Sequence, residues 1–316
     1  MRRAALALAL LLCACGQPTG AFAPIAIKAV PIPLDPEDPG HVSFGAFTYV
    51  GGLWLTSRDT SRLHGLSDLK IDPSGRLIAQ GDEGDVLEGR LRLDSRGRPA
   101  AIDEARIGRL TGPDGRELKG KDESDSEGVA VLPDGDRLVS FERHDRILLY
   151  PAAGGPPRLA PSPNVKFPYN TGMEALTADP EVGPDAYLVG SEGDGRIWAC
   201  KVSGSCVERR RVAVPPAFGL TAIAALPGGR LAALTRAFDP LRSVRVQISI
   251  TGPDGAELGR LNLARPLNID NFEGLAALPR PDGSVRFYVI SDDNFAFFQR
   301  TLFLAFDWRP PTPAAP

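Results

Sequence analysis

The sequence predicts an all-β fold, and within that class a β-propeller. A short apolar strand, a turn containing Pro or Gly, and a second apolar strand recur at intervals of about 45–60 residues, the length of one four-stranded blade. No long stretch shows helical periodicity. The 34 glycines and 30 prolines suit a chain with many tight turns. A β-sandwich is the alternative architecture.

Five copies of this repeat can be aligned, and they begin at Gly65, Ser126, Met173, Leu220 and Phe272. A second element also repeats, because the pentapeptide Thr111–Gly115 is identical to Thr251–Gly255. Pro followed by Asp-Gly presets a turn, so we expect these segments to form the outer hairpins of two blades.

The first clear repeat is preceded by Phe47–Thr56, which has the pattern of a further hairpin. We expect it to close the ring against the C-terminal strand Leu302–Trp308. Radial stacking of blades buries their apolar faces and leaves only short exposed edges. Six blades is the favoured count, with five or seven as alternatives.

The N-terminus predicts export. A positively charged start precedes the apolar run Ala4–Leu12, which is typical of a signal peptide and too short to span a bilayer as a mature helix. Leu12–Gly16 resembles a lipobox in which Cys15 is lipidated, and an ordinary secretory signal is the alternative. We expect residues 1–15 to be a lipoprotein signal peptide. No Asp follows Cys15, which favours an anchor in the outer membrane, facing the periplasm of the cell envelope.

The remaining composition sets the domain limits. Residues 16–40 read as a tether with a first strand, 41–309 as the propeller and 310–316 as a Pro-rich tail. The 36 basic and 39 acidic residues give a net charge of −3, which excludes nucleic acid as an expected partner. We expect a monomer that touches the membrane only through its lipid.

Two cysteines remain in the mature chain, Cys200 and Cys206, separated by Lys-Val-Ser-Gly-Ser. Gly204 permits a tight reversal between them, and an exported protein meets an oxidising compartment. A disulfide across a hairpin is therefore predicted.

Two positions of the repeat attract charged or polar side chains. The start of the inner strand carries Asp68, Glu127, Glu174, Thr221 and Glu273. The end of the next strand carries Asp82, Glu142, Glu192, Arg236 and the pair Asp292-Asp293. Equivalent positions of a propeller converge on one end of the central channel, so we expect a ring. The alternative is that these side chains hold adjacent blades together by hydrogen bonds.

Crowded carboxylates repel one another unless a cation neutralises them, and Ca²⁺ suits a flexible cage of carboxylate oxygens. The predicted ligands are Asp68, Asp82, Glu127, Glu174, Glu273 and Asp292. Arg143 and Arg236 would share the rim and pair with acids or bind an anionic substrate. His64 and His144 lie beside repeat positions, where a surface or packing role is favoured.

Several motifs resemble those of the phytase-like family, also described as "esterase-like activity of phytase". They are Gly65–Asp68, Ser126–Gly128, Asp270–Gly274, Ile290–Phe295 and Gln299–Leu302. The resemblance spans roughly Leu63 to Trp308 and is most specific in its last block. It implies an exported propeller that hydrolyses a small ester or phosphoester.

The resemblance and the ring together imply a mechanism. Ca²⁺ held by Glu127, Glu174, Glu273 and Asp292 would polarise the ester, while Arg143 or Arg236 would stabilise the developing charge. The chain has no dense Lys cluster, so a simpler phosphoester or a carboxylic ester is expected rather than phytate. The alternatives are a lactonase-like carboxylic ester hydrolase and a non-enzymatic propeller that binds a ligand or protein.

Overall fold

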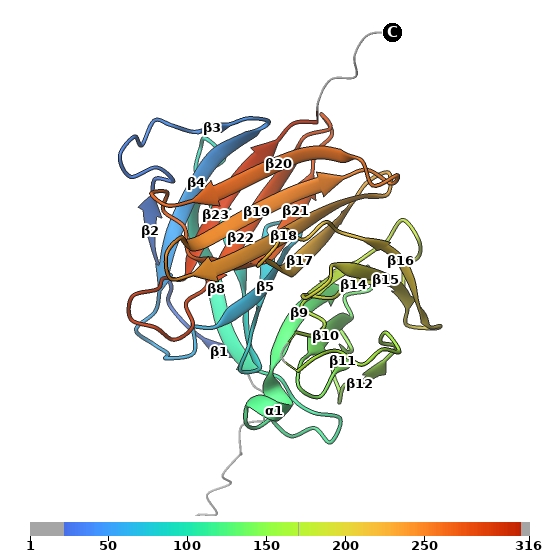
Figure 1. Cartoon of the computed structure of the whole chain (residues 1–316). Coiled ribbons are helices and arrows are strands. Elements are labelled where there is room, and N and C mark those ends of the chain that lie inside the picture. The colour runs from blue at the N-terminus through green and yellow to red at the C-terminus, as the bar shows by residue number, and fades with distance from the viewer. Residues whose placement is uncertain (1–21, 170, 311–316) are drawn as a thin grey trace, which may run out of the picture.

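The computed structural model describes residues 22–169 and 171–310. In Figure 1 these residues form sheets grouped around a common centre. The predicted signal peptide with Cys15, and residues 311–316 of the predicted tail, lie outside the described residues. Of the helices in the described part, none has the length and apolar character needed to cross a bilayer.

The described strands form five antiparallel sheets, numbered here as blades 1 to 5. Blade 1 contains β5 (Leu66–Ile71), β6 (Arg76–Gly81), β7 (Asp85–Leu93), β8 (Pro99–Arg109) and β1 (Ala23–Pro24). Blade 2 contains β9 (Ser126–Val131), β10 (Arg137–Phe141), β11 (Arg146–Tyr150) and β12 (Arg158–Ala160). Blade 3 contains β13 (Ala175–Ala178), β14 (Ala186–Gly190), β15 (Arg196–Lys201) and β16 (Cys206–Arg211).

The last two blades share one hydrophobic cluster. Blade 4 contains β17 (Gly219–Leu226), β18 (Arg230–Asp239), β19 (Ser243–Thr251) and β20 (Glu257–Ala264). Blade 5 contains β21 (Asn271–Pro279), β22 (Val285–Asp292), β23 (Leu302–Trp308), β4 (Phe47–Thr56), β2 (Lys28–Ile32) and β3 (Ser43–Phe44). Phe287, Phe306 and Trp308 of blade 5 are fully buried in the cluster that joins these two blades.

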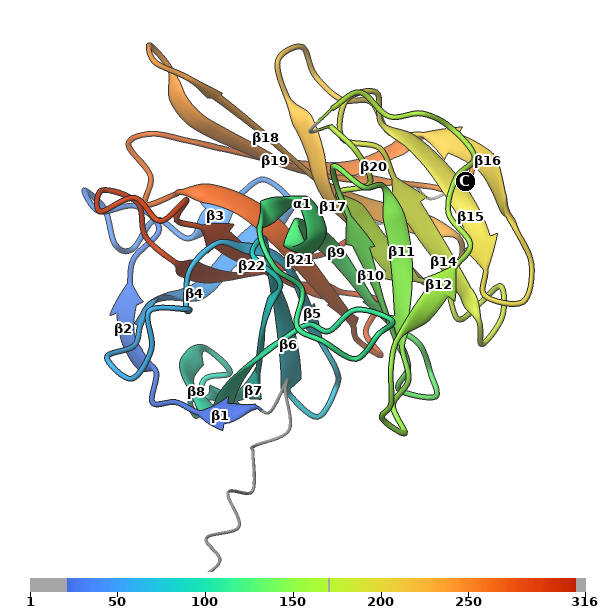
Figure 2. The same cartoon turned by 90° about the horizontal axis from the view of Figure 1, so that it is seen from below.

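The innermost strand of each blade contacts the innermost strand of the next, and β21 of blade 5 contacts β5 of blade 1, so the ring is closed. Figure 2 shows these strands around a centre over which the short helix α1 (Lys121–Ser124) lies. The protein is therefore an all-β, five-bladed propeller. The favoured count of six was wrong because Phe47–Thr56 completes blade 5 instead of adding a blade.

The predicted closure between the two ends of the chain is confirmed. Strand β4 runs antiparallel to β23, with Trp54 opposite Leu302 and Phe47 opposite Trp308. Strand β2 then pairs with the other edge of β4. Phe47–Thr56 is thus one long strand between two partners, and only Ser43–Phe44 turns back on it as a short hairpin.

The two identical pentapeptides adopt the same turn in different settings. In each, the second residue donates its backbone N–H four residues onward, from Gly112 to Arg116 at 2.7 Å and from Gly252 to Ala256 at 2.8 Å. Only Thr251–Gly255 joins two outer strands, β19 and β20. The expectation for Thr111–Gly115 was wrong, because β7 and β8 are already joined before it and it lies in the connection to α1.

Blade 3 carries the one disulfide among the described residues. Cys200 is the last residue but one of β15, Cys206 begins β16, and the two are directly opposite each other in the strand register. The bond therefore closes the outer hairpin of this blade.

Candidate functional site

Strand register defines which side chains converge at one end of the channel. A bulge at the start of β5, β9, β17 and β21 aligns Glu127, Thr221 and Glu273 with Ser67, not with its neighbour Asp68, and Glu174 directly precedes β13. The second strands contribute Asp82, Glu142, Glu192 and Asp292 at or just after their ends, and Arg236 within β18. The connection before β9 adds Lys121 and Asp125, which lie outside the repeat.

Five of these side chains form what we call the acidic cluster: Asp125, Glu127, Glu142, Glu174 and Glu192. Carboxylate oxygens of Asp125, Glu127 and Glu142 all lie within 4.8 Å of one another, and the same is true of Glu142, Glu174 and Glu192. Glu142 belongs to both groups and links blade 2 to blade 3. All but Glu192 are buried.

Three members of the acidic cluster, Glu127, Glu174 and Glu192, have no hydrogen-bond or ion-pair partner among the described residues, and the first two are buried. Glu127 and Glu174 are only 7% and 8% exposed, yet neither carboxylate has a hydrogen bond or ion pair to any described residue. By contrast, Glu142 accepts the backbone N–H of Gly172. Carboxylates crowded in a largely buried site repel one another, so these two fit an additional positively charged group.

Burial and mutual repulsion raise the pKa of these carboxyl groups, which therefore keep their protons to a higher pH. Burial, followed by the negative charges around it, raises the pKa of Glu127 and of Glu174 well above the ordinary value. Burial raises the pKa of Glu142 to about 7 against the bond from Gly172, with added repulsion from Glu192. Near neutral pH the acidic cluster is therefore partly protonated, and a divalent cation would displace those protons.

The predicted acids Glu273 and Asp292 lie in blade 5. Glu273 accepts hydrogen bonds from Arg236 at 2.9 Å and from Asn271 at 2.8 Å. Burial opposes the charge of Arg236, but Glu273, Glu174 and Glu192 outweigh it and raise the pKa of this guanidinium above its ordinary value. Asp292 accepts the N–H of Asn294 at 2.6 Å, and burial with repulsion from Glu273 raises its pKa to about 8.

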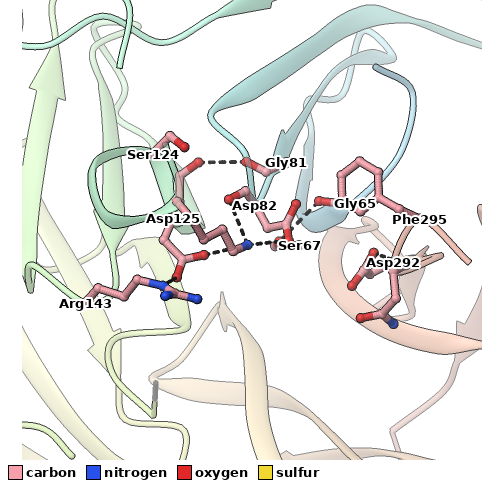
Figure 3. Close-up of polar contacts among 12 residues, drawn as sticks. Gly65, Ser67, Gly81, Asp82, Ser124, Asp125, Arg143, Asp292 and Phe295 are labelled. Atoms are coloured by element: carbon pink, nitrogen blue, oxygen red, sulfur yellow. Dashed lines mark hydrogen bonds and ion pairs between the residues drawn. The ribbon is translucent and has the colours of Figure 1, made fainter. Parts of the chain in front are cut away.

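Lys121 and Arg143 provide the positive charge on the side of blades 1 and 2. The ammonium of Lys121 lies 2.5 Å from Oδ2 of Asp82 and 2.7 Å from Oδ1 of Asp125. Arg143 donates to Asp125 at 2.5 Å and to the hydroxyl of Tyr169 at 2.7 Å. Figure 3 shows Asp82 and Asp125 approaching each other, with Arg143 beyond Asp125. Asp82 is therefore salt-bridged, although its buried Oδ1 has no partner among the described residues.

Asp68 lies apart from the acidic cluster. Its carboxylate is fully buried, contacts the ammonium of Lys70 at 2.7 and 2.6 Å, and accepts the backbone N–H of Val129 in β9 at 2.8 Å. These contacts join blade 1 to blade 2, so the blade-stitching alternative describes this residue. In the other blades the residue equivalent to Asp68 is Gly or Ala. At Gly128, a Cβ would lie 2.6 Å from the carbonyl oxygen of Glu174.

One pair at the same end of the channel was not predicted from the sequence. Nδ1 of His64 lies 2.6 Å from Oδ2 of Asp293, whose Oδ1 accepts the N–H of Gly65 at 3.2 Å. Asp293 also accepts a hydrogen bond from the hydroxyl of Thr301 at 3.0 Å. The pair ties blade 1 to the connection after β22.

The chain is distantly similar to several solved structures. It matches a candidate gluconolactonase with 14% identity over 91% of this chain and 94% of the other, at a TM-score of 0.47. It matches virginiamycin B lyase from Staphylococcus aureus with 14% identity over 90% and 100%, at 0.43. It matches a nidogen/laminin complex chain with 10% identity over 81% and 95%, at 0.45. Similarities as distant as these say nothing about what this chain binds or converts.

No curated protein is detectably similar to the chain. The family described as "Phytase-like: Esterase-like activity of phytase" matches residues 61–295, which include every member of the acidic cluster and both rim arginines. The chain belongs to this phytase-like family.

Proposed function

We propose that the protein is a Ca²⁺-dependent hydrolase of small phosphoesters or carboxylic esters, with the acidic cluster as its metal site. The observation that carries the proposal is that Glu127 and Glu174, two largely buried residues, have no hydrogen-bond or ion-pair partner among the described residues and lie in contact range of other carboxylates. The family description, which names esterase-like activity, supports the reaction class.

The donor set fits a hard cation. All five members of the acidic cluster offer oxygen, the ligand type of Ca²⁺. Ca²⁺–oxygen bonds are about 2.3–2.6 Å long, so two ligands on opposite sides of the ion lie about 5 Å apart. Within each group the carboxylate oxygens lie within 4.8 Å of one another, close enough to share one ion. Glu127, Glu142, Glu174 and Glu192 would hold the ion, which when bound supplies Lewis-acid polarisation of the ester.

Other side chains would bind and orient the substrate. Arg236 and Arg143 present guanidinium groups at the rim, where they favour an anionic ester and the charge that develops on it. Asp292 forms no ion pair with a described residue, and its pKa of about 8 lets Oδ2 exchange a proton near neutral pH.

The proposed location is the cell envelope, with the mature chain anchored through lipid on Cys15 in the outer membrane. The signal-peptide pattern supports export, and the Cys200–Cys206 disulfide suits an oxidising compartment.

The test uses the purified protein, stripped with a chelator and assayed on a generic phosphomonoester and a generic carboxylic ester with and without Ca²⁺. We expect turnover to return with Ca²⁺ and to fall at least about a hundredfold in Glu127→Gln. Glu208→Gln, in the exposed strand β16, is the matched control and should retain full turnover.

Three outcomes would distinguish the proposal from its alternatives. If Ca²⁺ raises the melting temperature and no ester is hydrolysed, the non-enzymatic binding propeller is the better account. If Arg236→Gln lowers turnover of the phosphoester but not of the carboxylic ester, Arg236 binds the phosphate group of the substrate. A lactonase-like enzyme would be insensitive to that change with both esters.

A further inference from the structure

Exposed aromatic side chains gather at the end of the channel that carries the acidic cluster. We define the apolar rim as Tyr169, Phe238, Leu241, Phe295, Phe297 and Phe298. Phe297 is 99% and Leu241 97% exposed, and the others are at least half exposed. Among the exposed aromatic residues in the described part, Trp54 is the one that does not belong to the apolar rim. It lies on strand β4.

The apolar rim comes from connections that share one end of the propeller. Phe238 and Leu241 belong to the β18–β19 hairpin, and Phe295, Phe297 and Phe298 belong to the connection between β22 and β23. In both Figure 1 and Figure 2 this hairpin and this connection project to the same side of the molecule. Tyr169 lies in the connection from blade 2 to blade 3.

Each part of the apolar rim adjoins a charged residue of the site. The Tyr169 hydroxyl bonds to Arg143, whose guanidinium lies 5.5 Å from the ring centroid. Phe238 is two residues beyond Arg236 in β18, so both side chains leave the same face of the strand. Phe295 borders Asp82, since a Cβ on Gly65 would meet both side chains at once (Figure 3).

The connection that carries three of these rings is held in place. Asn294 and Phe295 have φ of 46° and 53°, a left-handed conformation that costs about 1–3 kcal/mol for a non-glycine residue. Asp292 accepts the N–H of Asn294, and Asp293 accepts the N–H of Phe295 at 3.3 Å. Asp292 and Asp293, which lie at the site, therefore also hold the loop on which Phe297 and Phe298 are exposed.

We infer that the substrate of the proposed hydrolase is amphipathic: an ester or phosphoester group enters the site, and an attached aryl or alkyl group packs on the apolar rim. This inference rests on the proposed function. Concentrated apolar surface on one face marks a binding region. A lipid surface is the less favoured occupant, because the acidic cluster on the same face would be repelled by anionic headgroups.

The experiment compares a bulky with a small ester in three proteins. The substrates are 2-naphthyl phosphate and glycerol 2-phosphate, with 2-naphthyl acetate and ethyl acetate as the carboxylic pair. The rim variant is Phe297→Ser combined with Phe298→Ser, and the control is Leu159→Ser, which is 68% exposed on β12. The ratio of kcat/KM for the bulky and small substrates is compared between proteins, so differences in intrinsic reactivity cancel.

We expect the ratio to fall about tenfold in the rim variant, the discrimination typical of a modest apolar contact, and to stay unchanged in Leu159→Ser. An unchanged ratio in the rim variant would overturn the inference while leaving the hydrolase intact. If no substrate is hydrolysed, binding of 2-naphthyl phosphate by naphthyl fluorescence decides: about tenfold weaker binding in the rim variant supports the rim, and equal binding overturns it. Loss of sedimentation with phosphatidylglycerol vesicles, at an unchanged kcat/KM ratio, would assign the rim to a membrane instead.

Discussion

Without a cation, the domain should lose stability as the pH rises, which can be tested by melting the chelated protein between about pH 5.5 and about pH 8.5. The cause is Glu142, whose pKa lies at about 7 in the folded protein and near 4.5 when unfolded. The folded state favours the neutral form. Its stabilising effect is complete below the unfolded pKa and is lost as the pH passes the folded one.

The magnitude follows from these two values. Across this pH range the folded state gives up about 2 kcal/mol of unfolding free energy through Glu142 alone. A domain of this size shifts its melting temperature by about 2–4 °C per kcal/mol, so a fall of about 5 °C is expected. Asp292, with its pKa of about 8, acts in the same direction.

Differential scanning calorimetry of the wild type and of Glu142→Gln isolates the effect. The amide cannot ionise, so the variant should show a smaller fall than the wild type by about 5 °C. Glu208→Gln on the exposed strand β16 should behave as the wild type. Saturating Ca²⁺ should abolish the fall, because the bound ion favours the ionised carboxylates. A wild-type melting temperature that is flat or rises with pH in chelator would refute the reasoning.

Two further predictions concern residues outside the acidic cluster. Asp68→Asn should lower the free energy of unfolding by about 3–5 kcal/mol, because the Lys70 ammonium loses its buried partner, while calorimetrically measured Ca²⁺ affinity stays unchanged. Weaker Ca²⁺ binding in this variant would show that Asp68 belongs to the metal site, against this interpretation. Cys200→Ser with Cys206→Ser should cost about 2–3 kcal/mol in denaturant unfolding, the same as reducing the wild type, and should leave turnover unaffected. Equal stability with and without the bond would contradict this.

Much of the fold was accessible from the sequence because each blade repeats the same strand–turn–strand pattern. The count failed at Phe47–Thr56, since a strand shared between the two chain ends looks like the start of its own blade. Pairing partners far apart in sequence leave no local signal. The repeated pentapeptide failed for a related reason: its letters specify a turn, and the turn can join any two segments.

The site was predicted in outline because strand register brings equivalent repeat positions together. The sequence comparison grouped Asp68 with Glu127 because both residues carry a carboxyl group. In the structure, the bulge places Ser67 at the position that is equivalent to Glu127. Lys121 and Asp125 were missed because they belong to an insertion between blades, which has no counterpart in the other repeats. Only the folded chain shows that their side chains reach the rim.

The pairing of β4 with β23 also has a consequence for how the chain acquires its shape. Strand β4 is synthesised before the strands of blades 2 to 4, and its register partners in β23 are synthesised after them. Until β23 has left the ribosome, β4 has an unsatisfied edge and the fifth sheet lacks its outer half. Such long-range pairing is slow to form, so folding of this domain should be completed only after β23 has been synthesised. C-terminal truncation just before Leu302 should consequently leave an aggregation-prone chain and not a smaller propeller.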